Sequence, residues 1–198
     1  MADFAHKAAT SSACLDTLAE YNHYCLVAGG LVGEGLTRVF AASGKEDASL
    51  ASQVRLSHSV GSFLQKTNII RDFREDVDDH RFFWPREIWG SEEYGRGPDG
   101  RAFQEMREMH EPSNARRAAW VQSAIVVDAL GHVEDALECL LLLRNPSVLR
   151  SVSIPITLAI ATLALCFMNP EVFQRKVKIR KAEAASVRVA RQSLLSGH

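Results

Sequence analysis

Apolar residues recur every three or four positions through most of the chain, which is the spacing that places them on one face of an α-helix. Strand-like alternation is scarce, and runs of β-branched residues are short. The pattern predicts an all-α fold with five or six helices in one domain, residues 1–198, of which 1–14 form a flexible tail. The predicted helical segments are 15–42, 47–76, 102–110, 114–144, 147–168 and 170–195.

One stretch, residues 78–100, breaks the helical pattern. It contains two prolines and four glycines, which predict an irregular loop. Loops of this length in compact domains are often either functional or disordered.

The predicted helix at 15–42 has an unusual composition, because its middle carries Gly29, Gly30, Gly33 and Gly35. Each glycine costs a helix about 1 kcal/mol relative to alanine. Such a cost indicates the close approach of another backbone or of a ligand.

Composition and charge narrow the class of protein. The chain has 198 residues, of which 46% are apolar and 24% charged, as in ordinary globular domains. A formal net charge of −1 argues against nucleic acid as the main partner. The four cysteines are widely spaced without a CxxC pair, which favours reduced, buried thiols over a zinc or redox site.

Neither end of the chain indicates secretion or a membrane anchor. The N-terminus lacks the uninterrupted apolar core of a signal peptide. Segment 147–168 is apolar nearly all round, which predicts a helix buried in the core. Its apolar run, 154–168, is shorter than the ~20 residues that a membrane span needs. We therefore expect a cytoplasmic protein with no transmembrane anchor.

Three carboxylates, Asp72, Glu75 and Asp76, follow at helical spacing within the sequence DFRED. Positions i, i+3 and i+4 share one helix face, where like charges repel unless a cation joins them. Oxygen ligands of this kind suit Mg²⁺, which typically bridges to substrate phosphates. A solvated acidic helix end gives the same pattern, so spacing alone leaves both interpretations open.

Other polar side chains accompany this acidic run. Asn68 and Arg71 precede it, and they could pair with the carboxylates or receive phosphate oxygens. A basic cluster lies within RKVKIRK and forms either a solvated charged face or a site for a phosphate-bearing ligand. Its members are Lys178, Arg180 and Lys181, together with Arg175 and Lys176. Tyr24 is either a packed aromatic residue or a proton donor with a cation-facing ring.

Several motifs, in their order and spacing, resemble those of squalene synthases. The motifs are GLVGEGLTRVFAAS at 30–43, FLQKTNIIRDFRED at 63–76, RFFWP at 81–85, LRNPSV at 143–148, AIATLA at 159–164 and VKIRK at 177–181. The resemblance implies the helical isoprenoid synthase fold, which phytoene synthases share. It also implies a transferase of isoprenoid biosynthesis that joins two farnesyl diphosphates with Mg²⁺ and NADPH, and that is peripheral to the endoplasmic reticulum.

The resemblance also assigns roles to individual residues. Asp72, Glu75 and Asp76 match the second of two aspartate-rich motifs that hold Mg²⁺ and diphosphate in this family. The glycine-rich helix, with Gly30, would flank the prenyl channel.

Polar residues on either side of the acidic motif receive roles in the same way. Asn68 and Arg71 match positions linked to the diphosphate and the NADPH region. Lys178 and Arg180 match residues proposed for the NADPH phosphates.

The chain also departs from the family pattern. Aligned without a gap, the family's catalytic tyrosine falls on Val27, and Tyr24 matches another tyrosine one helical turn earlier. The family has phenylalanine at Ser151 and glutamine at Ile156, on a helix that lines its reaction cavity. These changes predict a reshaped cavity. We expect a repurposed enzyme that acts on an isoprenoid or another hydrophobic biosynthetic intermediate and does not make squalene alone.

The family's first aspartate-rich motif lies in a region that precedes the part matched by this chain, so we expect a truncated member. Fewer helices would leave an apolar groove exposed, which predicts a homodimer or a dedicated protein partner. Two other functions remain open. One is an authentic but truncated farnesyl-diphosphate farnesyltransferase, and the other is a catalytically dead protein that binds a ligand or a partner.

Overall fold

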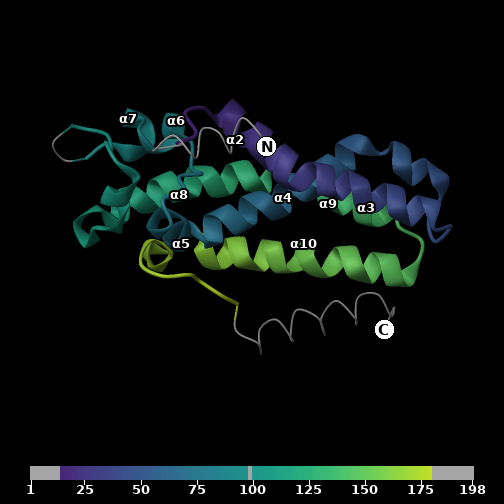
Figure 1. Ribbon diagram of the computed structural model, residues 1–198. Helices are drawn as coiled ribbons and strands as arrows, with labels where there is room; N and C mark the ends of the chain where they lie inside the picture. The colour runs from purple at the N-terminus through teal and green to yellow at the C-terminus, as the bar shows by residue number, and fades with distance from the viewer. Residues whose placement is uncertain (1–13, 98–99, 180–198) are drawn as a thin grey trace.

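The computed structural model describes residues 14–97 and 100–179. Within these ranges it contains helices and no strand, and one isolated β-bridge joins Cys14 to Phe82. The predicted all-α fold is therefore confirmed. Figure 1 shows long helices lying side by side, with short helical turns at both ends of the bundle.

The helical elements differ in type and length. The α-helices are α2 (Leu18–Cys25), α3 (Leu31–Ala42), α4 (Val54–Arg71), α5 (Phe73–Asp78), α6 (Arg86–Trp89), α7 (Glu92–Gly95), α8 (Ala115–Leu130), α9 (Val133–Leu142) and α10 (Pro146–Cys166). The π-helix is η1 (Leu26–Gly30), and the 3₁₀-helices are η2 (Ala48–Ser52), η3 (Met106–His110), η4 (Pro112–Asn114) and η5 (Pro170–Phe173).

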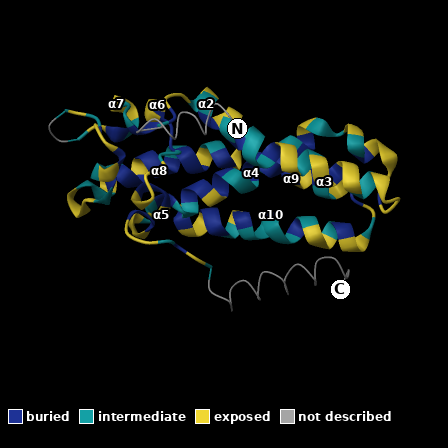
Figure 2. Cartoon of the chain, viewed as in Figure 1, coloured by how far each residue is buried: buried dark blue, intermediate teal, exposed yellow. Residues whose placement is uncertain are grey.

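Helix α4 is the centre of the bundle, because it packs against η1, α3, α8, α9 and α10. Its sequence places Leu56, Phe63 and Ile70 at helical spacing, and all three side chains are buried. Figure 2 shows the buried residues concentrated along α4 and the faces turned toward it. Burial of each such side chain contributes about 2 kcal/mol, so this face accounts for much of the stability of α4.

The glycines of the first long helix bring its backbone against α4. A Cβ atom built on Gly29 would lie 2.4 Å from the Gly61 carbonyl oxygen, and one on Gly33 would lie 2.2 Å from the Ser57 carbonyl oxygen. Gly35, in contrast, has nothing within 4 Å of such an atom. The sequence left open whether a backbone or a ligand approaches these glycines. For Gly29 and Gly33, the approaching group is the backbone of α4.

Residues 18–42 of the predicted segment 15–42 form one continuous helical stretch whose middle turn is the π-helix η1. A π-turn holds one residue more than an α-turn, and such turns are frequent at functional sites. Thr17 begins the stretch with a capping box, since its hydroxyl accepts from the Glu20 amide at 3.1 Å. Ser43 ends it, followed by Gly44 at φ +69°, which agrees with the predicted end of the helix at residue 42.

Two predicted helices are each divided in the structure. Segment 47–76 becomes η2, α4 and α5, and α4 ends at Asp72, whose backbone (φ −94°, ψ 10°) is not helical. Segment 114–144 becomes α8 and α9, separated at Gly131 and His132. The prediction of a helix from 170 onward was wrong as far as 179, because only η5 is helical there, and residues 180–195 lie outside the described residues.

Helix α10 differs from its prediction in length and in burial. It has 21 residues and includes Pro155, and only a third of its apolar window is buried, so it is a flanking helix and not a fully enclosed one. By length and composition, both α10 and the stretch Leu18–Ala42 could cross a membrane, a test that core helices of soluble proteins also meet. The expectation of no membrane anchor therefore cannot rest on the length of the apolar run.

Two tryptophans attach the first part of the irregular stretch, residues 84–89, to the bundle. The Trp84 indole is buried and donates to the Ile69 carbonyl at 3.5 Å, and the Trp89 indole donates to the Trp84 carbonyl at 3.0 Å. The short helices α6 and α7 lie within the irregular stretch. These contacts hold the segment from Trp84 to Trp89 against the end of α4.

Candidate acidic cleft at the junction of α4 and α5

A cleft of about 340 Å³ lies where α4 gives way to α5. It contains five of the residues that the sequence singled out, and they come from two segments that are distant in the chain. The lining residues are Tyr24, Gln65, Asn68, Ile69, Arg71, Asp72, Asp76, Arg81 and Phe83. We call this the acidic cleft.

Asp72 occupies the break between the two helices, which leaves its carboxylate at the cleft wall. The Arg71 guanidinium donates to both of its oxygens, from Nε at 2.8 Å and from Nη2 at 2.6 Å. Burial of Asp72 raises the pKa of its carboxyl, but the hydrogen bonds from Arg71 and Lys176 outweigh this and lower the pKa. Asp72 is therefore an anion at neutral pH.

Asp76 lies one helical turn further on and is more deeply buried. The Arg81 guanidinium holds its Oδ1 atom at 3.1 Å from Nε and 2.8 Å from Nη2. Burial raises the pKa of Asp76 above its usual value, although Arg81 opposes the shift. The cleft thus holds two carboxylates, and each is paired with an arginine that also lines the cleft.

Tyr24 forms the aromatic side of the cleft. Its ring stacks on Phe83 with the centroids 5.0 Å apart and the planes 23° from parallel. Burial, followed by the nearby Cys25 and Asp76, raises the pKa of the Tyr24 phenol. The phenol therefore keeps its proton at neutral pH and can donate it in a hydrogen bond.

Glu75, the middle carboxylate of the motif, does not line the acidic cleft. It is exposed and accepts from the Lys176 ammonium group at 2.7 Å, while the same ammonium group lies 3.0 Å from Asp72 Oδ1. The structure therefore divides the three predicted metal ligands, because Asp72 and Asp76 face the cleft and Glu75 faces the segment that follows η5.

The donor set of the cleft offers Mg²⁺ two carboxylates, and a ligand phosphate would complete the site. No group of three His, Cys, Asp or Glu side chains converges within residues 14–97 and 100–179. Mg²⁺ in phosphate-transferring sites is often bound by one or two carboxylates, with waters and substrate phosphates completing the shell. Asp72 and Asp76 could supply the carboxylates, and Arg71 and Arg81 suit the remaining phosphate oxygens.

The residues predicted to shape a cavity lie elsewhere. Val27 is half-buried in η1, and Gly30 is buried where η1 meets α4. Ser151 is exposed on α10 and its hydroxyl donates to the Val148 carbonyl of the same helix, whereas Ile156 belongs to the core. None of them lines the acidic cleft.

The basic residues after η5 are less well placed. Lys178 is exposed in a non-helical segment and does not line the acidic cleft. Arg180 lies outside the described residues. Lys176, which the sequence placed in the same basic cluster without singling it out, reaches the acidic motif.

Sequence reasoning also missed four cleft residues, Gln65, Ile69, Arg81 and Phe83. Arg81 and Phe83 belong to RFFWP, which carried part of the resemblance without receiving a role. The signal that could have found Arg81 is electrostatic, because a buried or half-buried carboxylate needs a nearby cation.

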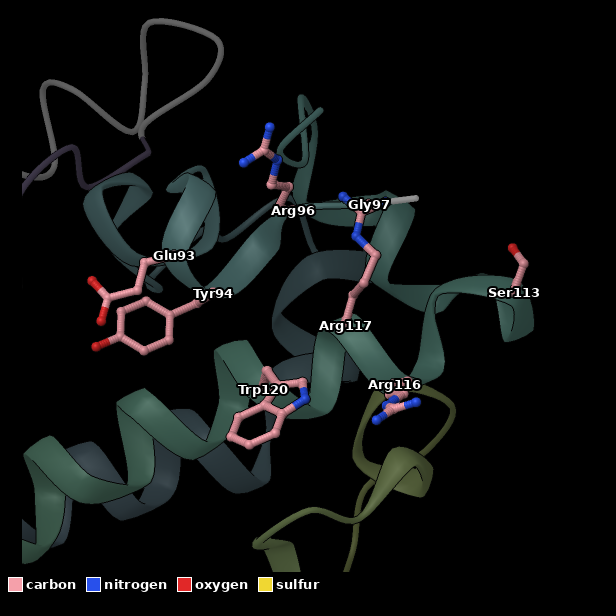
Figure 3. A pocket seen from close by; sticks show the side chains of 8 residues that line it. All are labelled: Glu93, Tyr94, Arg96, Gly97, Ser113, Arg116, Arg117 and Trp120. Atoms are coloured by element: carbon pink, nitrogen blue, oxygen red, sulfur yellow. The ribbon is translucent and has the colours of Figure 1, made fainter. Parts of the chain in front are cut away.

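Two further clefts surround the bundle. One, of about 530 Å³, lies on another side of α4 and includes the Lys66 ammonium group, which pairs with Asp128 at 2.7 Å. The other, of about 640 Å³, lies beside α7 and α8, and Figure 3 shows Tyr94 and Trp120 among the residues that line it. Arg117, which also lines this cleft, has a structural role, because its guanidinium group donates two hydrogen bonds to the Gly95 carbonyl, at 2.5 Å and 3.0 Å.

The helical bundle and the acidic cleft define the class of helical isoprenoid synthases. Within that class, the chain belongs to the squalene/phytoene synthase family, which matches residues 1–183. It is 56% identical to the squalene synthase of Ganoderma lucidum over 94% of this chain and 40% of the relative. It is 43% identical to that of Yarrowia lipolytica over 87% of this chain and 37% of the relative.

Solved structures agree with the sequence relatives. The complex of TcSQS with the ligand BPH1237 superposes with a TM-score of 0.80 and 41% identity, over 88% of this chain and 49% of that chain. A second TcSQS complex, with the ligand E5700, gives the same TM-score. The chain thus spans about 40% of the length of the curated relatives and about half of the solved ones.

Proposed function

We propose that this chain binds a prenyl diphosphate with Mg²⁺ in the acidic cleft and takes part in prenyl transfer. The observation that carries the proposal is the convergence of Tyr24, Arg71, Asp72, Asp76 and Arg81 on one small space. Two carboxylates, two guanidinium groups and an aromatic wall suit a ligand with a charged head and an apolar chain.

Each group has a separate task in this proposal. The Arg71 and Arg81 guanidinium groups turn from their carboxylates toward diphosphate oxygens, to which they can bind in a bidentate manner. Asp72 and Asp76 are then free to hold Mg²⁺. When bound, the metal supplies charge that stabilises diphosphate as a leaving group.

Tyr24 and Phe83 complete the site. Their stacked rings provide an apolar, electron-rich surface beside the diphosphate position. The protonated Tyr24 phenol supplies a hydrogen-bond donor. The proposal assigns no task to NADPH, since Lys178 is exposed away from the acidic cleft.

The experiment is calorimetric titration of the chain with a non-hydrolysable thiolo analogue of farnesyl diphosphate, with and without Mg²⁺. We expect binding that requires Mg²⁺ and that is lost in Asp72→Asn. Binding of equal strength without Mg²⁺, or binding unaffected by Asp72→Asn, would refute the proposal.

The sequence-based hypothesis of a repurposed substrate remains a separate proposal. It rests on Val27, Ser151 and Ile156, of which Val27 is closest in sequence to a cleft residue, one turn after Tyr24. Product analysis after incubation with farnesyl diphosphate, Mg²⁺ and NADPH tests it, because squalene as the product would favour the alternative of a farnesyltransferase.

Self-association is part of the proposal as well. Helix α3 exposes Leu31, Val32, Leu36 and Val39, each with 49% to 61% of its surface accessible. When another helix covers such an apolar stripe, the free energy gained is roughly 25 cal/mol for each Å² of apolar surface removed from water. We propose that a second copy covers it, and that the protein lies in the cytoplasm or at the surface of the endoplasmic reticulum.

A further inference from the structure

Lys176 connects the acidic motif to the segment that follows η5. Its ammonium group lies 3.0 Å from Asp72 Oδ1 and 2.7 Å from Glu75 Oε2, so it bridges two carboxylates of the motif. A single cation between two carboxylate oxygens is the arrangement that a divalent metal ion would otherwise satisfy. The sequence, in contrast, placed the functional charges of this segment at Lys178 and Arg180.

Buried neighbours on both sides hold Lys176 in this position. Phe173 is almost fully buried and meets the Phe73 ring edge-on at 5.2 Å. Val177, directly after Lys176, is also buried, and the Gln174 side chain donates to the His110 carbonyl at 2.7 Å. The backbone that carries Lys176 is therefore fixed, and only the flexible side chain is free to move.

Each carboxylate of the acidic motif has a basic partner. Arg71 pairs with Asp72 and Arg81 pairs with Asp76, whereas Lys176 supplies the ion pair to Glu75. Arg81 and Arg71 also line the acidic cleft, where phosphate oxygens can take the place of carboxylates. Lys176 does not line that cleft, so a ligand in the cleft offers it no alternative partner.

We propose that Lys176 is a built-in counter-ion that competes with a divalent metal ion for Asp72. Metal binding at Asp72 then requires the ammonium group to leave this carboxylate and to remain on Glu75, which lies outside the cleft. Glu75 is in this account the residue that receives Lys176, not a third metal ligand. The inference rests on the proposed function, because it concerns the same metal position.

The test measures metal binding directly, with Mn²⁺ as the probe and electron paramagnetic resonance of free Mn²⁺ as the readout, without substrate. Lys176→Gln removes the competing charge, and we expect roughly three- to tenfold tighter Mn²⁺ binding, the range expected for loss of a partly exposed ion pair. Lys176→Arg keeps the charge and should bind Mn²⁺ as the unaltered chain does.

Arg175→Gln is the matched control. Arg175 is the adjacent residue and carries the same charge, but it pairs with Glu171 at 2.6 Å and not with the acidic motif. We expect its Mn²⁺ affinity to stay within twofold of the unaltered chain, which excludes a general effect of net charge. Circular dichroism of each variant confirms that the helical content is retained.

The outcomes separate this inference from the proposed function. Mn²⁺ affinity that is unchanged or weaker in Lys176→Gln, or no detectable binding in either protein, overturns the role of Lys176. An equal gain in Arg175→Gln overturns it as well. A gain in Lys176→Gln alone supports it even if the chain fails to bind the farnesyl analogue, in which case only the proposed function fails.

Discussion

Gly29 and Gly61 meet backbone to backbone where η1 crosses α4. A Cβ atom added to Gly61 would lie 2.1 Å from the Gly29 carbonyl oxygen, and one added to Gly29 would lie 2.4 Å from the Gly61 carbonyl oxygen. This contact fixes the distance between the helix that carries Tyr24 and the helix that ends at Asp72. The shape of the acidic cleft therefore depends on two residues that do not line it.

This contact predicts a large effect of a small substitution. Gly61→Ala should lower the free energy of unfolding by about 2 kcal/mol or more, because overpacking displaces one helix from the other. Gly35→Ala is the control, since it also lies in a helix but has open space around it. That change should raise the free energy of unfolding by up to ~1 kcal/mol. Urea denaturation measures both, and equal effects would contradict the close contact.

The buried pair of Lys66 and Asp128 predicts a second stability effect. The Lys66 side chain is only 3% exposed and lies over the Tyr21 ring at 5.5 Å. Lys66→Met leaves the Asp128 carboxylate without its partner and should cost about 3 kcal/mol in urea denaturation. The double variant with Asp128→Leu should recover most of that loss, and failure to recover would show that Lys66 acts mainly through packing.

The raised pKa of Asp76 predicts that one substitution will increase stability and abolish ligand binding. Its pKa is raised by burial, so the folded state disfavours the charged carboxylate, and the stability that Asp76 contributes is lost as the pH rises through its raised pKa. Asp76→Asn should therefore raise the free energy of unfolding at pH 7 by up to about 1 kcal/mol, while it abolishes Mg²⁺-dependent ligand binding. The gain should vanish below pH 3, where the native carboxyl is also neutral. Denaturation at both pH values checks this.

The exposed stripe on α3 predicts a concentration-dependent assembly. Sedimentation at micromolar concentration should show a dimer, and Leu36→Glu combined with Val39→Glu should convert it to a monomer because both side chains are exposed. A monomer in the unaltered chain would contradict self-association through this face. Leu141→Glu, on α9 and also exposed, is the control for a general effect of added charge.

The helical class and most helix positions could be predicted from the sequence, because apolar spacing and caps are local properties. Local patterns did not indicate the break at Asp72, which divides one predicted helix into α4 and α5. That break decides which carboxylates face the cleft. Directly after the break, Phe73 packs against Trp84 and Phe173, and contacts between residues distant in the chain leave no local pattern.

The candidate site shows the same division. Motif spacing identified Asn68, Arg71, Asp72 and Asp76, which the structure brings together in the acidic cleft. It did not indicate that Lys176 reaches Glu75 across 101 positions of sequence. Charge partners of this kind become visible only when the fold is known.

The most direct test of the account compares two arginine substitutions. Arg81→Met removes a guanidinium group that lines the acidic cleft, whereas Arg74→Met removes one that pairs with Asp78 and does not line it. The account predicts at least tenfold weaker binding of the farnesyl thiolo-diphosphate analogue, with Mg²⁺ present, for Arg81→Met, and binding within twofold of the unaltered chain for Arg74→Met. Equal affinities of the two variants in calorimetric titration would contradict it.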